Sequence, residues 1–318
     1  MRKKEIDLAR GIGILLVVLG HSDISSITHK FIYSFHMPLF FIISGYLYDE
    51  EKYKCYNTLN FVKKKFNSYI VPYFYLCFIN LFLVSIELIK NNNLKKIFKH
   101  LIGIIYSRGT TEWLPNCSPL WFLTCIFCTE IIFYLINKQN NKYIYLLFCM
   151  VLGYLIYSSL TIKLFWNIDT ALISVIYIFI GNLIKKYKIL EKIKCTMVIV
   201  LFSIGIIFIL LNNYNVNFDE NEYGNIAFMY IASISMSLVV LKLAFYIKSN
   251  YVLEFLGRNT IIIIGFNYFI LSISNRILNK FYLSVNILKV ILNYILQLIL
   301  LFIIIIIYNS YKIKKGEK

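Results

Sequence analysis

The chain has 318 residues, of which 59% are hydrophobic and 17% aromatic, and its mean hydropathy is +0.69. Soluble domains average nearer half apolar residues, so this composition excludes an ordinary soluble domain and indicates a protein of the lipid bilayer. The net charge of +17 would suggest a nucleic-acid partner in a soluble protein, but here we read it as a signal of topology and expect no nucleic acid.

The sequence predicts an all-α fold, a polytopic membrane bundle in one domain covering residues 1–318. Crossing a bilayer takes roughly 20 apolar residues per helix, and ten apolar runs between polar clusters approach that length. No repeat, flexible linker or second soluble domain interrupts them. The predicted spans are 8–20, 35–48, 69–89, 120–137, 143–162, 168–184, 195–211, 226–246, 259–275 and 285–308.

The distribution of positive charge predicts that both termini are cytoplasmic. An even number of spans puts both termini on one side, and placing them inside gives 21 Lys and Arg residues to the inner segments against nine to the outer loops. Cytoplasmic loops carry the excess of Lys and Arg in membrane proteins. The lysine-rich loop after the third span opposes this trend, and its LKKIFKHLIGIIYS segment would either lie flat at a lipid interface or re-enter the membrane.

The first span, RGIGILLVVLGH, is apolar between two polar ends, Arg10 and His21. Eleven residues make about three helical turns, so the two side chains share one helix face roughly 16 Å apart. Asp7 is placed to pair with Arg10. A charge at membrane depth is costly unless it is paired or faces water, so such a stripe usually lines a cavity. The alternative, which the spacing leaves open, is that Arg10 snorkels to the headgroups and His21 caps the helix.

The second span begins with another histidine, in FHMPLFFIISGYLY. We expect His36 to face the same compartment as His21 across a short loop. Pro38 falls in the first turn, where its missing N–H is harmless, and Ser44 and Gly45 allow close helix packing.

Four segments in order, IDLARGIGILLVVLGH, FHMPLFFIISGYLY, SPLWFLTCIF and FLGRNTIIIIGFN, resemble the acyltransferase-3 family, in particular its polysaccharide and fucose O-acetylases. The hallmark of that family is an Arg, ten residues and a His in the first helix, here Arg10 and His21. The resemblance implies transfer of an acyl group, usually acetyl from acetyl-CoA, to a hydroxyl of a surface polysaccharide or its lipid-linked sugar precursor. His21 is then the catalytic histidine, and Arg10 positions or binds the acyl donor.

The residue types suit that chemistry. Histidine can take a proton from a sugar hydroxyl near neutral pH and return it to a thiolate. CoA is anionic, so the cytoplasmic Lys64 and Lys65 are candidate donor-binding residues, although topology alone also explains them. Many family members carry two arginines in this region, and lysine lacks the bidentate fork of arginine.

Glu130 lies inside the fourth predicted span. Because an unpaired carboxylate is costly there, we expect it to face a cavity or a partner such as Arg10, and it could orient His21 as part of the catalytic group. A structural hydrogen bond between helices explains it equally well. Trp121 opens the same span and is either an interfacial aromatic or a cavity wall that contacts substrate.

Two further residues are candidates for acceptor binding. Asp169, at the outer end of the sixth span, could meet an acceptor sugar, but helix N-capping explains it at least as well. Asn267 aligns with a histidine of many family members, and an amide can orient a substrate but cannot act as a base near neutral pH.

The same residues also suit other function classes. Arg, His and Glu inside a membrane also mark a transporter or flippase for a glycan or glycolipid, whereas a serine protease built on Ser44 and His36 fails because eight residues and Pro38 separate them. Cys125 and Cys128 form one CxxC inside an apolar span with no second pair, so we expect no metal. The composition, rich in Asn, Ile and Lys, suggests a bacterial source, so we expect a multi-pass protein of the bacterial cytoplasmic membrane with membrane lipid as a partner.

Overall fold

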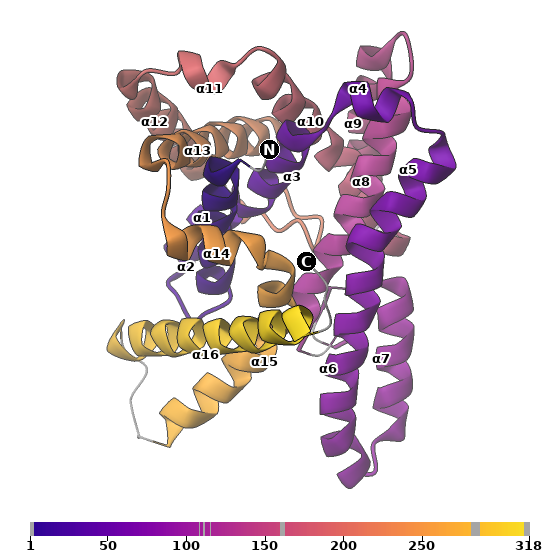
Figure 1. Ribbon diagram of the computed structural model, residues 1–318, viewed down its shortest axis with the longest axis vertical. Helices are drawn as coiled ribbons and strands as arrows, with labels where there is room; N and C mark the ends of the chain where they lie inside the picture. Colours follow the sequence, from indigo (N-terminus) through magenta and orange to yellow (C-terminus); the bar gives the residue numbers. More distant parts are fainter. Residues whose placement is uncertain are drawn as a thin grey trace.

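The computed structural model describes residues 3–107, 109–110, 112–114, 116–159, 163–280 and 287–314, and no strand occurs among them. The longer helices are α1 (Lys4–Gly20), α3 (His36–Leu47), α6 (Val71–Lys90), α7 (Leu94–Tyr106), α8 (Trp121–Asn137), α9 (Lys142–Ser159), α10 (Ile168–Lys186), α12 (Cys195–Leu211), α13 (Ile226–Ile247), α15 (Thr260–Asn279) and α16 (Ile287–Lys314) (Figure 1). The shorter ones are α2 (Ser26–Tyr33), α4 (Glu50–Lys54), α5 (Thr58–Lys65), α11 (Ile189–Lys192) and α14 (Tyr251–Arg258), with a π-helical turn, Phe66–Ile70, and two 3-10 turns, Ser118–Leu120 and Phe165–Asn167.

The predicted all-helical membrane fold is confirmed. Each of the ten predicted spans falls on a helix, and seven helical segments of the described chain are long and apolar enough to cross a bilayer. Helices α1, α3 and α12 have 17, 12 and 17 residues, fewer than the roughly 20 of a full crossing, so ten crossings stay a prediction. The ends predicted at 160–162 and 285–286 lie outside the described residues.

The third span is longer than its apolar run. A continuous helix covers Thr58–Lys90, because α5, the π-helical turn and α6 follow one another without a break. Pro72 is the second residue after that turn. Since proline has no N–H and its ring crowds the preceding turn, a local change of helical hydrogen bonding accommodates it without ending the helix.

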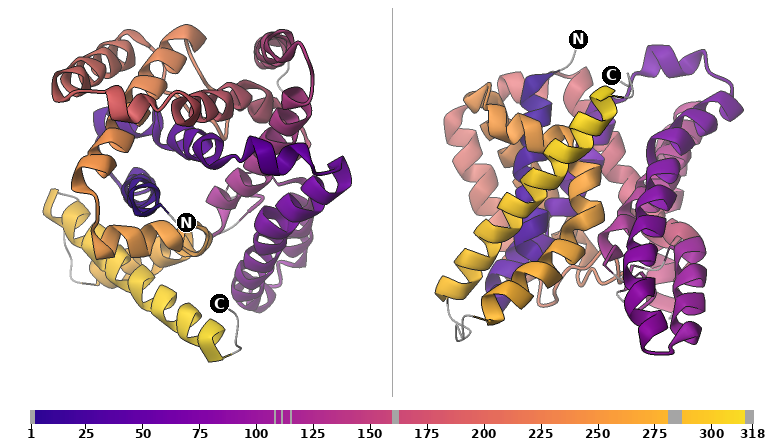
Figure 2. Two further views of the ribbon diagram at one scale, coloured as in Figure 1. Left: turned by 45° about the horizontal axis from the view of Figure 1, so that its top comes forward. Right: turned by 60° about the horizontal axis from the view of Figure 1, so that its bottom comes forward.

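Helix α7 stands beside α6 and runs antiparallel to it (Figures 1 and 2). The hydroxyl of Tyr73 on α6 donates a hydrogen bond to the Ile104 carbonyl on α7 over 2.7 Å. This packing favours the re-entrant alternative for the lysine-rich segment over a helix lying flat at an interface.

Helix α1 lies inside the bundle, where it is surrounded by other helices (Figure 2, left). It contributes Ile6, Leu8 and Ala9 to one apolar cluster, shared with α3, α8, α10 and α13. It contributes Ile14 and Val17 to a second, shared with α6, α15 and α16. Because α1 joins both clusters, its polar ends are held inside the protein instead of facing lipid.

Close helix packing at Gly45 is confirmed. A Cβ at Gly45 on α3 would lie 1.9 Å from the Ile178 carbonyl oxygen on α10, and a Cβ at Gly181 would lie 2.0 Å from that of Ile42. The start of α1 and the last turn of α16 lie at the same end of the bundle (Figure 2, right). The cytoplasmic assignment of that end stays a prediction.

Candidate active site

A cavity of about 1240 Å³ extends along α1, and Arg10, Ile14, Val17 and His21 line it. These residues recur every three or four positions, so they form one helix face. The prediction that the two polar ends of the first span share a face is confirmed, and that face lines a cavity. The other walls come from α2, α3, α6, α8, α14, α15, α16, the π-helical turn, the described part of the connection between α7 and α8, and the segment between α12 and α13.

His21 follows the last residue of α1 and meets two tyrosines. The hydroxyl oxygens of Tyr33 and Tyr268 each lie 3.2 Å from His21 Nδ1, and both tyrosines line the cavity. Tyr33 is the last residue of α2, whereas Tyr268 belongs to α15, 247 residues along the chain. The imidazole is thus held between two elements that are distant in sequence.

His36 lines the same end of the cavity as His21. The two histidines therefore lie close together, as predicted. Its Nδ1 lies 2.9 Å from the Ile32 carbonyl oxygen. A carbonyl can only accept, so Nδ1 carries the proton and donates it. In the neutral ring the remaining nitrogen, Nε2, is therefore a hydrogen-bond acceptor.

The segment between α12 and α13 forms the opposite wall at this end, through Asn217, Phe218, Asp219 and Glu220. Two acidic residues therefore line the cavity that contains both histidines, which gives this end donors, acceptors and negative charge.

Asp169 fixes that wall in place but does not line the cavity. Its Oδ2 accepts a hydrogen bond from Asn221 Nδ2 over 2.5 Å and one from the Leu164 N–H over 3.1 Å. Thr170 adds a bond from its hydroxyl to the Phe218 carbonyl, over 3.0 Å. Neighbouring donors take up its buried carboxylate, which indicates an anchoring role, and direct contact of Asp169 with an acceptor stays a prediction.

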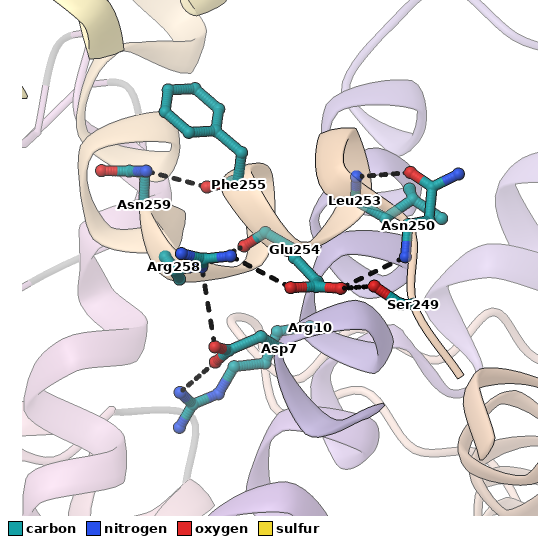
Figure 3. A network of polar contacts seen from close by, with 9 residues as sticks. All are labelled: Asp7, Arg10, Ser249, Asn250, Leu253, Glu254, Phe255, Arg258 and Asn259. Carbon is teal, nitrogen blue, oxygen red and sulfur yellow. Dashed lines mark hydrogen bonds and ion pairs between the residues drawn. The ribbon is translucent and has the colours of Figure 1, made fainter. Parts of the chain in front are cut away.

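At the other end of the cavity, two arginines flank one carboxylate (Figure 3). Arg10 Nη1 lies 3.9 Å from Asp7 Oδ1, which confirms the predicted pair, and Arg258 Nε lies 3.8 Å from Asp7 Oδ2. The side chains of Arg10 and Arg258 are 32% and 38% exposed, so a ligand in the cavity can reach both. A pair of guanidinium groups on one side of a cavity is suited to phosphate groups.

Glu254 holds Arg258 in place. Its Oε2 lies 3.1 Å from Arg258 Nη2, and its Oε1 accepts a 2.6 Å bond from the Ser249 hydroxyl (Figure 3). That hydroxyl keeps the pKa of the Glu254 carboxyl below its ordinary value, because hydrogen bonds to a carboxylate favour its charged form. Arg258 therefore has a charged partner on its own helix.

Two glycines bring α14 close enough to α1 to place Arg258 beside Arg10. A Cβ at Gly257 would lie 1.8 Å from the Asp7 carbonyl oxygen, and one at Gly11 would lie 2.1 Å from that of Leu253. Real Cβ atoms do not approach a backbone so closely. The small residues therefore allow the two backbones to touch.

Comparison with known proteins decides the family. The family model described as an acyltransferase domain, that of acyltransferase-3, matches residues 3–309. This chain belongs to the acyltransferase-3 family. No curated protein and no solved structure matches it. The family assignment covers almost the whole chain and, with the apolar helices, supports a multi-pass membrane acyltransferase.

In this acyltransferase Glu130 does not pair with Arg10, and the hydrogen bonds described for His21 come from tyrosines. Glu130 forms an ion pair with Lys65, accepts a hydrogen bond from Ser44 Oγ and accepts another, of 2.9 Å, from the Tyr69 hydroxyl. The expected pairing with Arg10 is wrong because Lys65 of α5 reaches the carboxylate. The geometry favours the alternative of a polar contact between helices.

The two lysines predicted to bind the donor have partners within the protein. Lys65 is committed to Glu130, and Lys64 Nζ lies 4.8 Å from the centre of the Tyr53 ring. Neither is among the described residues that line the cavity. In this acyltransferase, Arg10 and Arg258 are the cationic side chains of the described lining.

Trp121 and Asn267 differ in their relation to the cavity. Trp121 is 6% exposed and lines it, so the cavity-wall alternative holds. Asn267 is fully buried outside the described lining, and neither amide atom has a hydrogen-bond partner among the described residues. Its neighbour Tyr268 faces the cavity instead, because adjacent helix residues point about 100° apart.

Sequence reasoning therefore missed Tyr33, Tyr268, Arg258 and the Asp219–Glu220 pair. Arg258 and Tyr268 both lie within or directly beside FLGRNTIIIIGFN, which had been noted only for its resemblance. Tyr268 is four residues after Ile264, another cavity residue, so helical spacing would have pointed to it.

Proposed function

We propose that this acyltransferase transfers acetyl from acetyl-CoA to a hydroxyl of a cell-surface glycan or lipid-linked sugar precursor, in the cytoplasmic membrane of a bacterium. The observation that carries the proposal is one cavity with Arg10 and Arg258 at one end and His21 and His36 at the other. An anionic donor suits the first end, and a hydroxyl acceptor suits the second. The family assignment supports the transfer of an acyl group.

In the proposed reaction, the donor phosphates bind near Arg10 and Arg258, and the thioester arm follows α1 toward His21. The acceptor hydroxyl gives its proton to His21 while its oxygen forms a bond to the thioester carbonyl carbon. The C–S bond then breaks, and the proton passes from His21 to the leaving thiolate. The products are the O-acetylated sugar and CoA.

The acceptor end suits a polyhydroxylated ligand. His36 Nε2 can accept a hydrogen bond from a sugar hydroxyl, as can the carboxylates of Asp219 and Glu220. Trp121 adds an aromatic wall to the same cavity. In this proposal Asp169 acts on the acceptor only through the loop it anchors.

The deciding experiment measures O-acetyl content of surface polysaccharide by NMR in cells that lack the gene. The cells are complemented with wild type, His21→Ala or Arg10→Ala at matched membrane levels. We expect one O-acetyl signal to be lost on deletion and restored by wild type alone. Full restoration by His21→Ala would refute the proposal.

The same cavity would also suit a transporter of glycans or glycolipids, and a second assay separates the two functions. Purified protein in liposomes is given radiolabelled acetyl-CoA and a lipid-linked sugar. Movement of the sugar without consumption of acetyl-CoA would favour transport over transfer.

A further inference from the structure

Within the described part of the chain, hydroxyl groups hold the His21 ring and no carboxylate bonds to it. Its hydrogen-bond partners among the described residues are the hydroxyls of Tyr33 and Tyr268, both 3.2 Å from Nδ1. The Tyr268 ring lies 4.9 Å from the imidazole at an angle of 54°, and the Tyr33 ring lies 6.1 Å away, edge-on. Both hydroxyls contact Nδ1, so Nε2 is the ring nitrogen that can exchange a proton with the substrate.

We propose that Tyr33 and Tyr268 are positioning residues that keep the proton of neutral His21 on Nδ1, so that Nε2 is the nitrogen that accepts the proton of the acceptor hydroxyl. This inference rests on the proposed function, in which His21 is the base. A histidine base needs a lone pair on the nitrogen that faces the substrate, and the hydrogen bond at the other nitrogen decides which tautomer is present.

The count of donors and acceptors at Nδ1 supports donation from His21 Nδ1–H to the two tyrosine oxygens. Nδ1 has a single lone pair, for which two tyrosine O–H groups would compete. In the opposite direction, one Nδ1–H can be shared between two oxygens, since three-centre hydrogen bonds are common. Each tyrosine oxygen accepts in this arrangement and keeps its own proton for another partner.

Both tyrosines can use those protons within the cavity. Burial raises the pKa of Tyr33, which belongs to the connecting helix α2, so its hydroxyl stays protonated. Asp219 and Glu220 line the same cavity as the two tyrosines, and carboxylates are acceptors only. The hydroxyls are therefore suited to accept from His21 on one side and to donate toward the acidic wall or the acceptor on the other.

The tyrosine arrangement also serves the step after proton uptake. When Nε2 gains the acceptor proton, the ring becomes an imidazolium with a donor at each nitrogen. Nδ1–H then already has two oxygens in reach, so the charged ring needs no rotation before it returns the proton to the thiolate. A ring that could rotate freely would present the wrong nitrogen for part of the time.

The test is nitrogen NMR of the purified full-length protein, labelled with ¹⁵N at the imidazole nitrogens of its four histidines. Protonated and unprotonated ring nitrogens give separate signals, and comparison with His21→Gln assigns those of His21. We expect neutral His21 to carry its proton on Nδ1 in wild type. In the Tyr33→Phe/Tyr268→Phe double variant we expect a mixture of both tautomers. A wild-type proton on Nε2 would overturn the proposal.

Tyr294→Phe is the matched control. The Tyr294 hydroxyl also contacts α1, by a 3.1 Å bond to the Leu15 carbonyl, but it does not touch His21. We expect the His21 signals of this variant to equal those of wild type. Identical changes in Tyr294→Phe and in the double variant would show a general disturbance of α1 and would overturn the assignment of these tyrosines.

A kinetic measurement separates this inference from the proposed function. Inverted membrane vesicles of the source cells receive radiolabelled acetyl-CoA, and label in the endogenous glycan is followed. We expect the double variant to lose about tenfold in apparent kcat, because only part of its His21 then has the lone pair on Nε2 and the ring is less firmly oriented, with the KM for acetyl-CoA unchanged. Tyr294→Phe should retain wild-type values.

The NMR and kinetic measurements together distinguish a failure of the proposed function from a failure of this inference. Absence of acetyl transfer by wild type would refute the proposed function, while the NMR measurement would still decide the tautomer of His21. Full activity of the double variant, with His21→Gln inactive, would keep the proposed function and overturn the role of the two tyrosines.

Discussion

Glu130 of α8 and Lys65 of α5 form an ion pair inside the helical bundle, where their side chains are 3% and 13% exposed. Ser44 and Tyr69 complete the coordination of the carboxylate by hydrogen bonds to its other oxygen. A buried pair of this kind is strongly destabilised when one partner is removed, because the other charge is left in a medium of low dielectric constant.

Lys65→Met should therefore lower the free energy of unfolding by roughly 3 kcal/mol, as expected for one lost partner of a buried pair. Combining it with Glu130→Gln should recover most of that loss, since no charge is then left without a partner. Thermal unfolding of the detergent-purified protein measures both. Lys99→Met is the control, because its partner Glu112 is 67% exposed and such pairs contribute about 0–1 kcal/mol. A double variant as unstable as Lys65→Met would contradict this account.

Arg258→Gln should weaken binding of the donor. Loss of one charge-assisted hydrogen bond to a phosphate costs about 1.5–3 kcal/mol, which corresponds to at least about a tenfold rise in the KM for acetyl-CoA. The KM for acetyl-pantetheine, which lacks the nucleotide phosphates, should stay unchanged.

The control for this prediction is Arg276→Gln. Arg276 is on the neighbouring helix α15, is 73% exposed and contacts Glu87 at 3.8 Å, so both KM values should equal those of wild type. Equal rises of both KM values in Arg258→Gln would show that Arg258 does not recognise the nucleotide part of the donor.

Gly257→Ala should disturb the arginine end of the cavity. Its Cβ would collide with the Asp7 backbone oxygen at 1.8 Å, and overpacking of this kind costs about 1–3 kcal/mol. Because α14 must move away from α1, Arg258 leaves Arg10, and we expect a higher KM for acetyl-CoA together with lower thermal stability.

Gly13→Ala on α1 provides the comparison. The nearest atoms to its Cβ belong to the side chains of Phe40 and Leu39, at 3.0 and 3.1 Å, and side chains adjust more easily than backbone. We expect a smaller loss of stability and an unchanged KM. A Gly257→Ala protein with wild-type stability and KM would disprove the proposed close contact.

Asn221→Ala should release the acidic wall of the cavity. The variant loses the 2.5 Å bond to Asp169 and leaves that buried carboxylate one donor short, at a cost of about 1–3 kcal/mol. Limited proteolysis should cleave the connection between α12 and α13 faster than in wild type, and the rate of acetyl transfer should fall. Asn213→Ala, at an exposed position of the same connection, should behave as wild type in both assays.

Much of the fold was available from the sequence. The ten apolar runs each fall on a helix, because hydrophobic length is a local property of the chain. The 11-residue spacing of Arg10 and His21 placed both on one face, since helical periodicity is also local. Gly45 was correctly expected at a close helix contact.

The partners of the polar residues could not be read from local patterns. Glu130 meets Lys65 and not Arg10, and His21 meets Tyr268 from a helix 247 residues away. Which side chains meet across a bundle depends on how the helices tilt and rotate against one another, and packing of small residues such as Gly11 and Gly257 sets those angles.

The sequence by itself determined that this is a helical membrane protein of the acyltransferase-3 family with an arginine and a histidine on one face of its first helix. The tertiary structure alone decided that this face lines a cavity, that Arg258 stands beside Arg10, and that two tyrosines hold His21. The physical reason is the distance along the chain over which each effect acts. Hydrophobicity and helical period depend on neighbouring residues, whereas the site is assembled by contacts between helices that are brought together only when the bundle packs.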